Sequence, residues 1–324
     1  MIEPPAMPST QWREEIGADE EPRFERQAER LREIQRKNAA RAGMSRALHA
    51  KHTGCFAAEL HVGADLPEHA RVGLFAAPKV WRAYVRFSNG SSAHQPDRTP
   101  DVRGIGIKVL DVPGRKILPG LEGASTQDFL LIQSPSTPFR GSDDFVGLVW
   151  AARSKALALP RLLWRFGPGG VARLLGRLRS SLGTPVRSLA EQRYWSALPT
   201  KHGAYAVRWG LRPRATGDSP AAVGTPASAD HLRDDLVQRL RQGPLEWDLM
   251  AQFFEDEART PIEDASVAWP EDVAPFVTLA RLSLPKQDAD SSEGRALQQT
   301  IERLSFDPWH ATEDFRPLGE MMRA

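Results

Sequence analysis

Cysteine, tyrosine and net charge are all scarce in this sequence of 324 residues. Its single cysteine excludes an internal disulfide and any cysteine-rich zinc module. The formal charge of +2 gives no argument for a polyanionic partner. No apolar run has the length of a membrane span, and the opening MIEPPAMPSTQWREEIGADEEP lacks the basic start and apolar stretch of a signal peptide. The composition therefore predicts a cytoplasmic protein, and its 41% hydrophobic residues suffice for a sizeable core.

The N-terminal part of the chain predicts a loose segment followed by a helical arm. Residues 1–21 are rich in proline and acidic residues, a composition typical of disorder. The stretch FERQAERLREIQRKNAARAG then places small or apolar residues at helical spacing. This stripe consists of Phe24, Ala28, Leu31 and Ile34. We expect a helical arm within residues 22–45 that packs over the rest of a single domain, residues 22–324.

Two parts of the chain, residues 46–135 and 203–285, have the sequence pattern of strands. Alternating or short apolar runs occur in GCFAAELHV, VWRAYVRFS, VRGIGIKVL, DFLLIQS, GAYAVRWGLRP, LEWDLMAQFF and FVTLARLSLP. In VWRAYVRFS, every second residue from Trp81 to Phe87 is apolar, which predicts one buried face. Several strands without intervening helices favour an antiparallel sheet or barrel, and the helices elsewhere make the fold class α+β.

The stretch 145–195 predicts a basic helical insertion, broken at Pro160 and at GPGG, residues 167–170. Nine Lys or Arg and one acidic residue lie between Val146 and Arg193, among many leucines and two tryptophans. One interpretation is that the apolar face packs on the barrel while the arginines are solvated. Another is peripheral contact of residues 146–193 with an anionic membrane. A nucleic acid is disfavoured, because phosphate contacts do not require so many leucines.

The segment RALHAKHTGCF holds two histidines and the only cysteine. His49, His52 and Cys55 have the spacing of metal ligands on a helix, but the segment leads into a strand, on which His49 and His52 point to opposite faces. We therefore predict no metal site formed by these residues. A nucleophilic Cys55 would need a histidine base, which the sequence leaves open, whereas a lone cysteine in a strand is usually a small packed residue.

A second interpretation of this segment is a pocket for a flat, anionic ligand. The candidate residues are Arg46, His49, Arg86, Ser88, Gly104 and Gly106. Residues two apart share a strand face, so two arginines, a histidine and a wall bare of side chains can converge. Alternatively, the arginines face solvent and the paired glycines mark bulges.

These residues lie in segments that resemble the catalase superfamily, especially its small bacterial catalase-related members, which are haem-dependent peroxidase-like proteins. The segments are RALHAKHTGCF, AYVRFSNG, PDVRGIGIKVLD, TQDFLL, PIEDASVAWPEDVAPFVTLARLSLP and LSFDPWHATEDFRPLGEMM. The resemblance runs from about residue 40 to the C-terminal segment 286–324 and is weakest between residues 140 and 230. It implies an antiparallel β-barrel with surrounding helices and a bound haem.

The resemblance also implies a role for each site residue. His49 falls on the distal histidine, the catalytic acid and base, and Ser88 on the residue that holds its ring. Arg46 and Arg86 fall on positions that pair with haem propionates, for which the planar guanidinium is suited. Phe129 is expected near the haem face. The implied function is a haem-dependent peroxidase or catalase-like oxidoreductase that acts on hydrogen peroxide or organic hydroperoxides; a homodimer is also compatible with it.

The sequence departs from the family pattern at three points. The glycine of the HAKG-like motif is His52, and the stretch expected to hold the distal asparagine reads Ser125, Thr126, Gln127. The tyrosinate that binds iron in the family is expected a few residues beyond RPLGEMMRA. The three tyrosines here lie outside that motif, and two soft candidate ligands, Met321 and Met322, lie near it. The alternative function is therefore a haem-poor or non-catalytic protein of the same fold.

Overall fold

A computed structural model describes residues 7–42, 46–152, 157–182, 185–214 and 228–324. The helices are α1 (Glu20–Ala42), α2 (Ser142–Ala152), α3 (Ala158–Leu182), α4 (His231–Gln242), α5 (Ser292–Glu302) and α6 (Glu320–Arg323). The strands are β1 (His52–Val62), β2 (Val80–Asn89), β3 (Arg103–Leu110), β4 (Thr126–Ile132), β5 (Tyr194–Trp195), β6 (Thr200–His202), β7 (Tyr205–Pro213), β8 (Leu245–Phe253) and β9 (Phe276–Leu284). Single 3-10 turns span Glu68–Ala70, Gly73–Phe75 and Glu313–Phe315. Within the described ranges, no helix is both long enough and apolar enough to span a bilayer.

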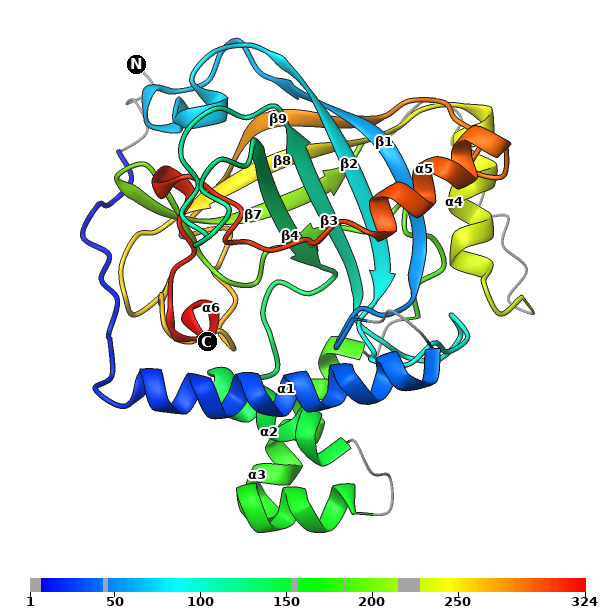
Figure 1. Cartoon of the computed structure of the whole chain (residues 1–324). Coiled ribbons are helices and arrows are strands. Elements are labelled where there is room, and N and C mark those ends of the chain that lie inside the picture. Colours follow the sequence, from blue (N-terminus) through cyan, green and yellow to red (C-terminus); the bar gives the residue numbers. More distant parts are fainter. Residues whose placement is uncertain (1–6, 43–45, 153–156, 183–184, 215–227) are drawn as a thin grey trace.

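The strands form one closed sheet. Their order in the sheet is β5-β4-β3-β2-β1-β9-β8-β7-β6. Strands that are neighbours in this order pair antiparallel. β5 also pairs with β7, where Tyr194 lies opposite Leu211, so the sheet closes into the barrel seen in Figure 1. The antiparallel barrel with surrounding helices that the sequence predicts is confirmed.

The main hydrophobic core fills the barrel. The alternate apolar residues of β2, from Trp81 to Phe87, are at most 6% exposed and belong to this core, as the alternation predicts. Arg86 and Ser88, on the opposite face of the same strand, are 4% exposed each. Because a barrel wall with polar residues outside would normally meet water, other elements must cover this outer side of β2.

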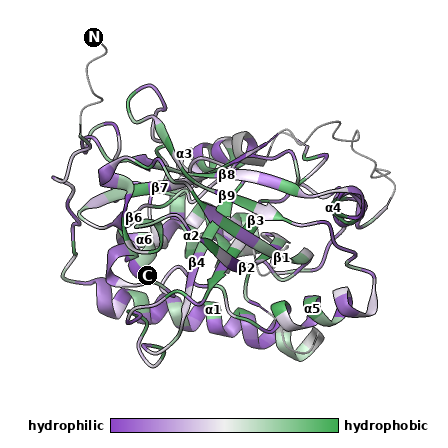
Figure 2. Cartoon of the chain, turned by 90° about the horizontal axis from the view of Figure 1, so that it is seen from above, coloured by the Kyte–Doolittle hydropathy of each residue, from purple (hydrophilic) through white to green (hydrophobic). Residues whose placement is uncertain are grey.

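Helices α1, α2 and α3 lie together beside the barrel, with α1 running along its underside in Figure 1. α1 is mostly hydrophilic (Figure 2) and contacts α2, while α2 and α3 share a second, smaller hydrophobic cluster. The helical segment that contains Pro160 begins at Ala158, so this proline lies in the first turn of α3, where a missing N–H costs no hydrogen bond. The break at 167–170 is a kink at Gly167, whose φ of 64° suits glycine.

The N-terminal segment contacts the C-terminal part of the chain. Composition predicts disorder for residues 1–21. In the structure, residues 7–18 contain no helix or strand, yet Trp12 Nε1 donates to the Ala204 carbonyl at 2.8 Å. The Glu14 carboxylate accepts a hydrogen bond from Arg316 at 2.7 Å. Acidic side chains that composition associates with disorder therefore find specific arginine partners here.

A buried ionic triad ties the C-terminal segment to the barrel. The Asp128 carboxylate on β4 lies 2.6 Å from Lys108 Nζ on β3 and 2.9 Å from His310 Nδ1. The exposed fraction of the Asp128 side chain is 0%. The backbone N–H of Asp307 also donates to this carboxylate, at 3.0 Å. These bonds hold the segment after α5 against the outer face of β3 and β4.

Candidate functional site

A cavity of about 770 Å³ lies on the covered outer side of β2, β3 and β4. Its lining combines polar groups from the barrel wall with apolar side chains from the helices. The wall residues include Arg86, Ser88, Gly104, Gly106 and Leu130. The covering residues include Leu31, Phe145, Leu148, Leu178, Phe306, Met321 and Met322. The volume lies within the range of protein sites for small molecules and cofactors.

His49 faces this cavity from an unusual backbone position just before β1. Its φ of 51° lies in the left-handed region, and its N–H donates to the Gly90 carbonyl at 3.0 Å. His49 Nδ1 lies 2.9 Å from Ser88 Oγ. A Cβ atom at Gly104 would lie 2.7 Å from His49 Cε1, closer than real Cβ contacts allow. The imidazole therefore lies against β3 only because residue 104 is glycine.

The His49 imidazole is neutral at pH 7. Burial lowers the pKa of His49 to about 4, and the positive charges of Arg86 and Arg46 act in the same direction. A neutral imidazole that faces a cavity can accept a proton from a bound molecule and return it.

The two predicted arginines do converge on the site, together with a carboxylate. Arg86 Nε and Nη2 donate to Glu302 at 2.8 and 3.0 Å, and Arg86 Nη2 also donates to the His49 carbonyl at 2.9 Å. Arg46 Nε lies 3.6 Å from Glu302, and Arg46 Nη2 donates to the carbonyl of Leu304 at 2.7 Å. Burial opposes ionisation of Glu302, but the hydrogen bonds and charge of Arg86 outweigh it, so the pKa of this carboxyl is lowered. The guanidinium groups that bind the Glu302 carboxylate have the geometry to bind a carboxylate of another molecule.

Glu302 also lies near His52 and Cys55, two of the residues whose spacing in the sequence resembles that of metal ligands. One ligand atom of each of these three residues lies within 4.8 Å of the others. Burial raises the pKa of the Cys55 thiol to about 12, so a thiolate nucleophile or ligand is unfavourable. Arg86 already occupies both oxygens of the Glu302 carboxylate, and its charge would repel a cation. The chemistry of these three residues therefore does not favour a metal ion.

Phe129 lies in the barrel core instead of the cavity. Its ring centroid is 4.9 Å from that of Trp209, and the side chain is 3% exposed. Because side chains alternate along β4, Leu130 faces the cavity in its place.

The other candidates named from the sequence take different positions. Gln127 is buried on β4 opposite Val109, outside the cavity lining. Among the described residues that line the cavity there is no tyrosine. Tyr194 is buried and donates its hydroxyl to the Leu189 carbonyl at 2.9 Å. Met321 and Met322 do line the cavity.

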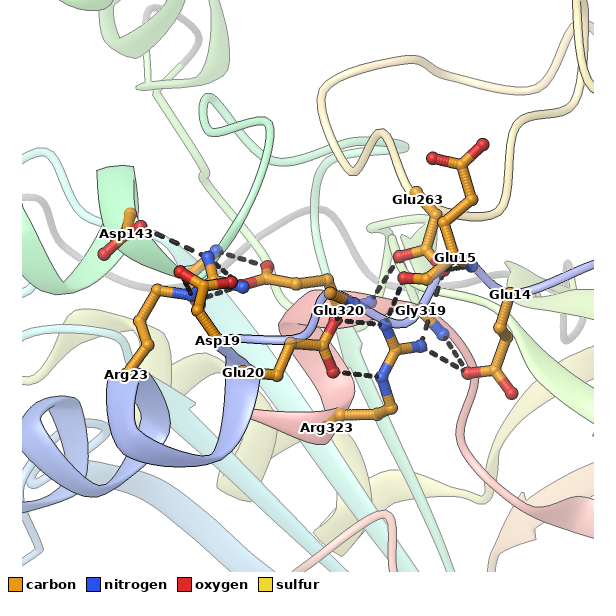
Figure 3. Close-up of polar contacts among 12 residues, drawn as sticks. Glu14, Glu15, Asp19, Glu20, Arg23, Asp143, Glu263, Gly319, Glu320 and Arg323 are labelled. Carbon is orange, nitrogen blue, oxygen red and sulfur yellow. Dashed lines mark hydrogen bonds and ion pairs between the residues drawn. The ribbon is translucent and has the colours of Figure 1, made fainter.

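An ion-pair cluster shown in Figure 3 fixes the C-terminal edge of the cavity. Arg323 donates to Glu14 at 2.6 Å, to Glu20 at 2.8 Å and to Glu263 at 3.4 Å. The hydrogen bonds to Glu20 are the largest contribution to the raised pKa of Arg323. The cluster places the adjacent methionines against the cavity.

Known proteins that are similar to this chain include a catalase-related peroxidase and catalases. No protein-family profile matches the chain. A catalase-related peroxidase of Mycolicibacterium paratuberculosis is 29% identical over 291 residues, which cover 85% of this chain and 83% of that protein. A fungal catalase superposes with a TM-score of 0.65 at 17% identity, over 99% of this chain. The chain is therefore similar in sequence to a catalase-related peroxidase and has the fold of the catalases.

A bacterial catalase gives a similar result, with a TM-score of 0.64 at 18% identity over 99% of this chain. The chain spans less than two thirds of the two catalases, namely 63% and 62% of their lengths. At these identities the structural likeness concerns the fold, whereas the sequence likeness to the peroxidase points to peroxide-related chemistry.

Proposed function

We propose that this chain is a haem-dependent peroxidase or catalase-like oxidoreductase acting on hydrogen peroxide or organic hydroperoxides. The observation that carries the proposal is a neutral His49, paired with Ser88, at the wall of a largely apolar cavity. A histidine kept neutral beside two arginines is suited to receive a proton at neutral pH. The likeness to a catalase-related peroxidase supports the same reaction class.

The residues of the cavity fit haem. Haem is a flat, mainly apolar group with two carboxylates, and the cavity offers about 770 Å³, an apolar lining and two arginines. At Gly106, a Cβ atom would lie 2.9 Å from the Phe306 ring, so glycine at this position lets Phe306 pack against the wall of the cavity. Arg46 and Arg86 would hold the propionates, since they already hold the Glu302 carboxylate. When bound, haem would supply an iron centre that binds peroxide and accepts its oxidising equivalents.

The chain's own residues would then move the proton and exclude water. His49 would accept the peroxide proton and return it to the departing oxygen. Ser88 Oγ engages Nδ1 at 2.9 Å, which leaves Nε2 as the ring nitrogen available for this transfer. The side chains of α2 and α3 that cover the cavity would keep bulk water away from the reacting atoms.

The second candidate function is a catalase-fold protein that holds haem weakly or performs no catalysis. Two observations favour it. The described lining of the cavity contains no tyrosine, and the Glu302 carboxylate already pairs with the arginines assigned to haem. Because Glu302 already pairs with these arginines, replacing it with a haem propionate would gain less binding free energy.

Haem titration and peroxide turnover of the purified chain test both candidates. We expect haem to bind and His49→Gln to lower peroxide turnover about 10²- to 10⁴-fold while haem still binds, since general acid–base catalysis contributes about that much. His61→Gln is the matched control, because His61 lies on β1 with its ring paired to Glu59 at 2.9 Å, outside the cavity lining. Undiminished turnover in His49→Gln would remove His49 from the mechanism. Failure of the wild-type chain to take up haem would favour the second candidate.

A further inference from the structure

The outer surface of α3 exposes an unusual number of large apolar side chains. Nine large apolar side chains are exposed in the described part of the chain, and five of them lie between residues 157 and 175. These five are Leu157 (48% exposed), Leu159 (55%), Leu163 (39%), Trp164 (90%) and Leu175 (53%). We call them the α3 apolar surface. A tryptophan that is 90% exposed gains nothing from the fold of this chain alone.

Other residues of α3 account for the packing that a globular protein needs. Leu162, Val171 and Leu174 are each at most 8% exposed and join a cluster with Phe145 and Leu148 of α2. The interpretation that an apolar face of this insertion packs inside the protein therefore explains only one side of α3. The exposed apolar side chains of α3 form a second apolar surface, which contact with an apolar environment outside this chain would stabilise.

The charge of α3 identifies that environment. Its sequence, ALPRLLWRFGPGGVARLLGRLRSSL, contains five arginines and no acidic residue. Arg173, Arg177 and Arg179 are exposed, as is Leu175 between them. Arginine beside leucine and tryptophan matches the headgroup region of an anionic bilayer, where the indole prefers the interface and each cation is attracted to the lipid charge.

Two other occupants fit less well. A second copy of the chain in a twofold arrangement would bring the same arginine-rich surface against itself, and like charges there oppose association. A nucleic acid would use the arginines but leave the exposed leucines without contacts. Figure 1 shows α2 and α3 projecting beyond α1 on the side away from the barrel, so a flat surface can reach them.

We propose that the α3 apolar surface docks this protein on anionic lipid bilayers. Leu178 of α3 and Phe145 and Leu148 of α2 line the cavity, so docking brings the cavity's helical wall to the lipid. The proposal concerns the chain itself and does not depend on bound haem.

Sedimentation of the full chain with vesicles tests the proposal. Vesicles of phosphatidylcholine containing phosphatidylglycerol should bind the chain more tightly than phosphatidylcholine alone, and more tightly at low salt than at high salt. Trp164→Ser should weaken binding about tenfold, as expected for one large side chain leaving an apolar environment. Arg173→Gln and Arg177→Gln should each weaken it about fivefold.

Leu121→Ser is the matched control, because Leu121 is 45% exposed in the loop between β3 and β4, and it should bind as the wild type does. Circular dichroism of each variant checks that the fold is retained. Equal and negligible binding to both vesicle types at low salt would overturn the proposal. So would a wild-type dimer that Trp164→Ser dissociates without any vesicle binding, because the occupant would then be a second copy.

Discussion

Lowering the pH from 7 to 5 should destabilise this protein through histidines that are buried in neutral form. Burial lowers the pKa of His202 to about 4, as it does that of His49. His202 is 0% exposed, its Nε2–H donates to the Ala70 carbonyl at 3.0 Å, and its ring contacts those of Trp209 and Phe315. Its Nδ1 has no hydrogen-bond partner among the described residues, so a second proton on this ring would be buried unpaired.

The sign and size of the effect follow from linkage. As the pH falls below 6.5, the ordinary pKa of histidine, the histidines of the unfolded chain bind protons, while these two rings of the folded chain stay neutral until about pH 4. The folded state thus keeps its full stability with respect to these two histidines above pH 6.5, and it loses part of that stability as the pH falls towards 4. Between pH 7 and pH 5 each such histidine lowers the free energy of unfolding by about 2 kcal/mol, or about 4 kcal/mol for the two. Paired carboxylates contribute little in this window, because they titrate mainly below it.

Urea unfolding at pH 7 and pH 5, followed by tryptophan fluorescence, measures this difference. His202→Gln keeps an N–H donor but cannot titrate, so its free energy of unfolding should fall by about 2 kcal/mol less than that of the wild type between the two pH values. Comparing the pH dependence within each variant removes any constant cost of the substitution. An identical fall in the wild type and in His202→Gln would refute the assignment of a buried neutral ring.

Three further substitutions test other contacts of the site and its support. Asp128→Asn should lower the free energy of unfolding in urea by about 3–5 kcal/mol, because this change leaves the Lys108 ammonium buried without a countercharge. The double variant Lys108→Met/Asp128→Leu should recover most of the lost stability. A loss below about 1 kcal/mol in Asp128→Asn would contradict the role of this ion pair. Gly104→Ala should displace the His49 ring, lowering peroxide turnover and reducing stability by about 1–3 kcal/mol, whereas unchanged turnover and stability would show that the ring can move at no cost. Glu302→Gln should raise haem affinity about tenfold in an absorbance titration by freeing the arginines, and a fall in affinity would mean that Glu302 supports the bound group.

The barrel could be predicted because its signal is local. On β2, the alternation from Trp81 to Phe87 is set by the pleat of a single strand, and the inward face needs no knowledge of partners. The same rule, applied to β4, would have placed Leu130 in the cavity, whereas the family resemblance alone pointed to Phe129. Alternation along the strand was the better guide there.

The carboxylate at the site could not be predicted, because its position depends on packing over a long stretch of chain. Glu302 meets Arg86 only when the end of α5 packs against β1 and β2, 216 residues away in sequence. Nothing in the local sequence TIERLSF distinguishes this glutamate from a solvated one. The direction of the His49 side chain was equally hidden, since a residue with a φ of 51° does not follow the alternation of the strand it precedes.

The Arg323 cluster joins segments that are synthesised at very different times. Glu20 and Arg323 are 303 residues apart, so at about 5–20 residues per second of synthesis roughly 15–60 s separate their appearance on the ribosome. The strands that form the cavity wall are made well before Met321 and Met322, which form its last side. The contacts that hold Met321 and Met322 against the cavity can therefore form only after the strands of its wall have been synthesised.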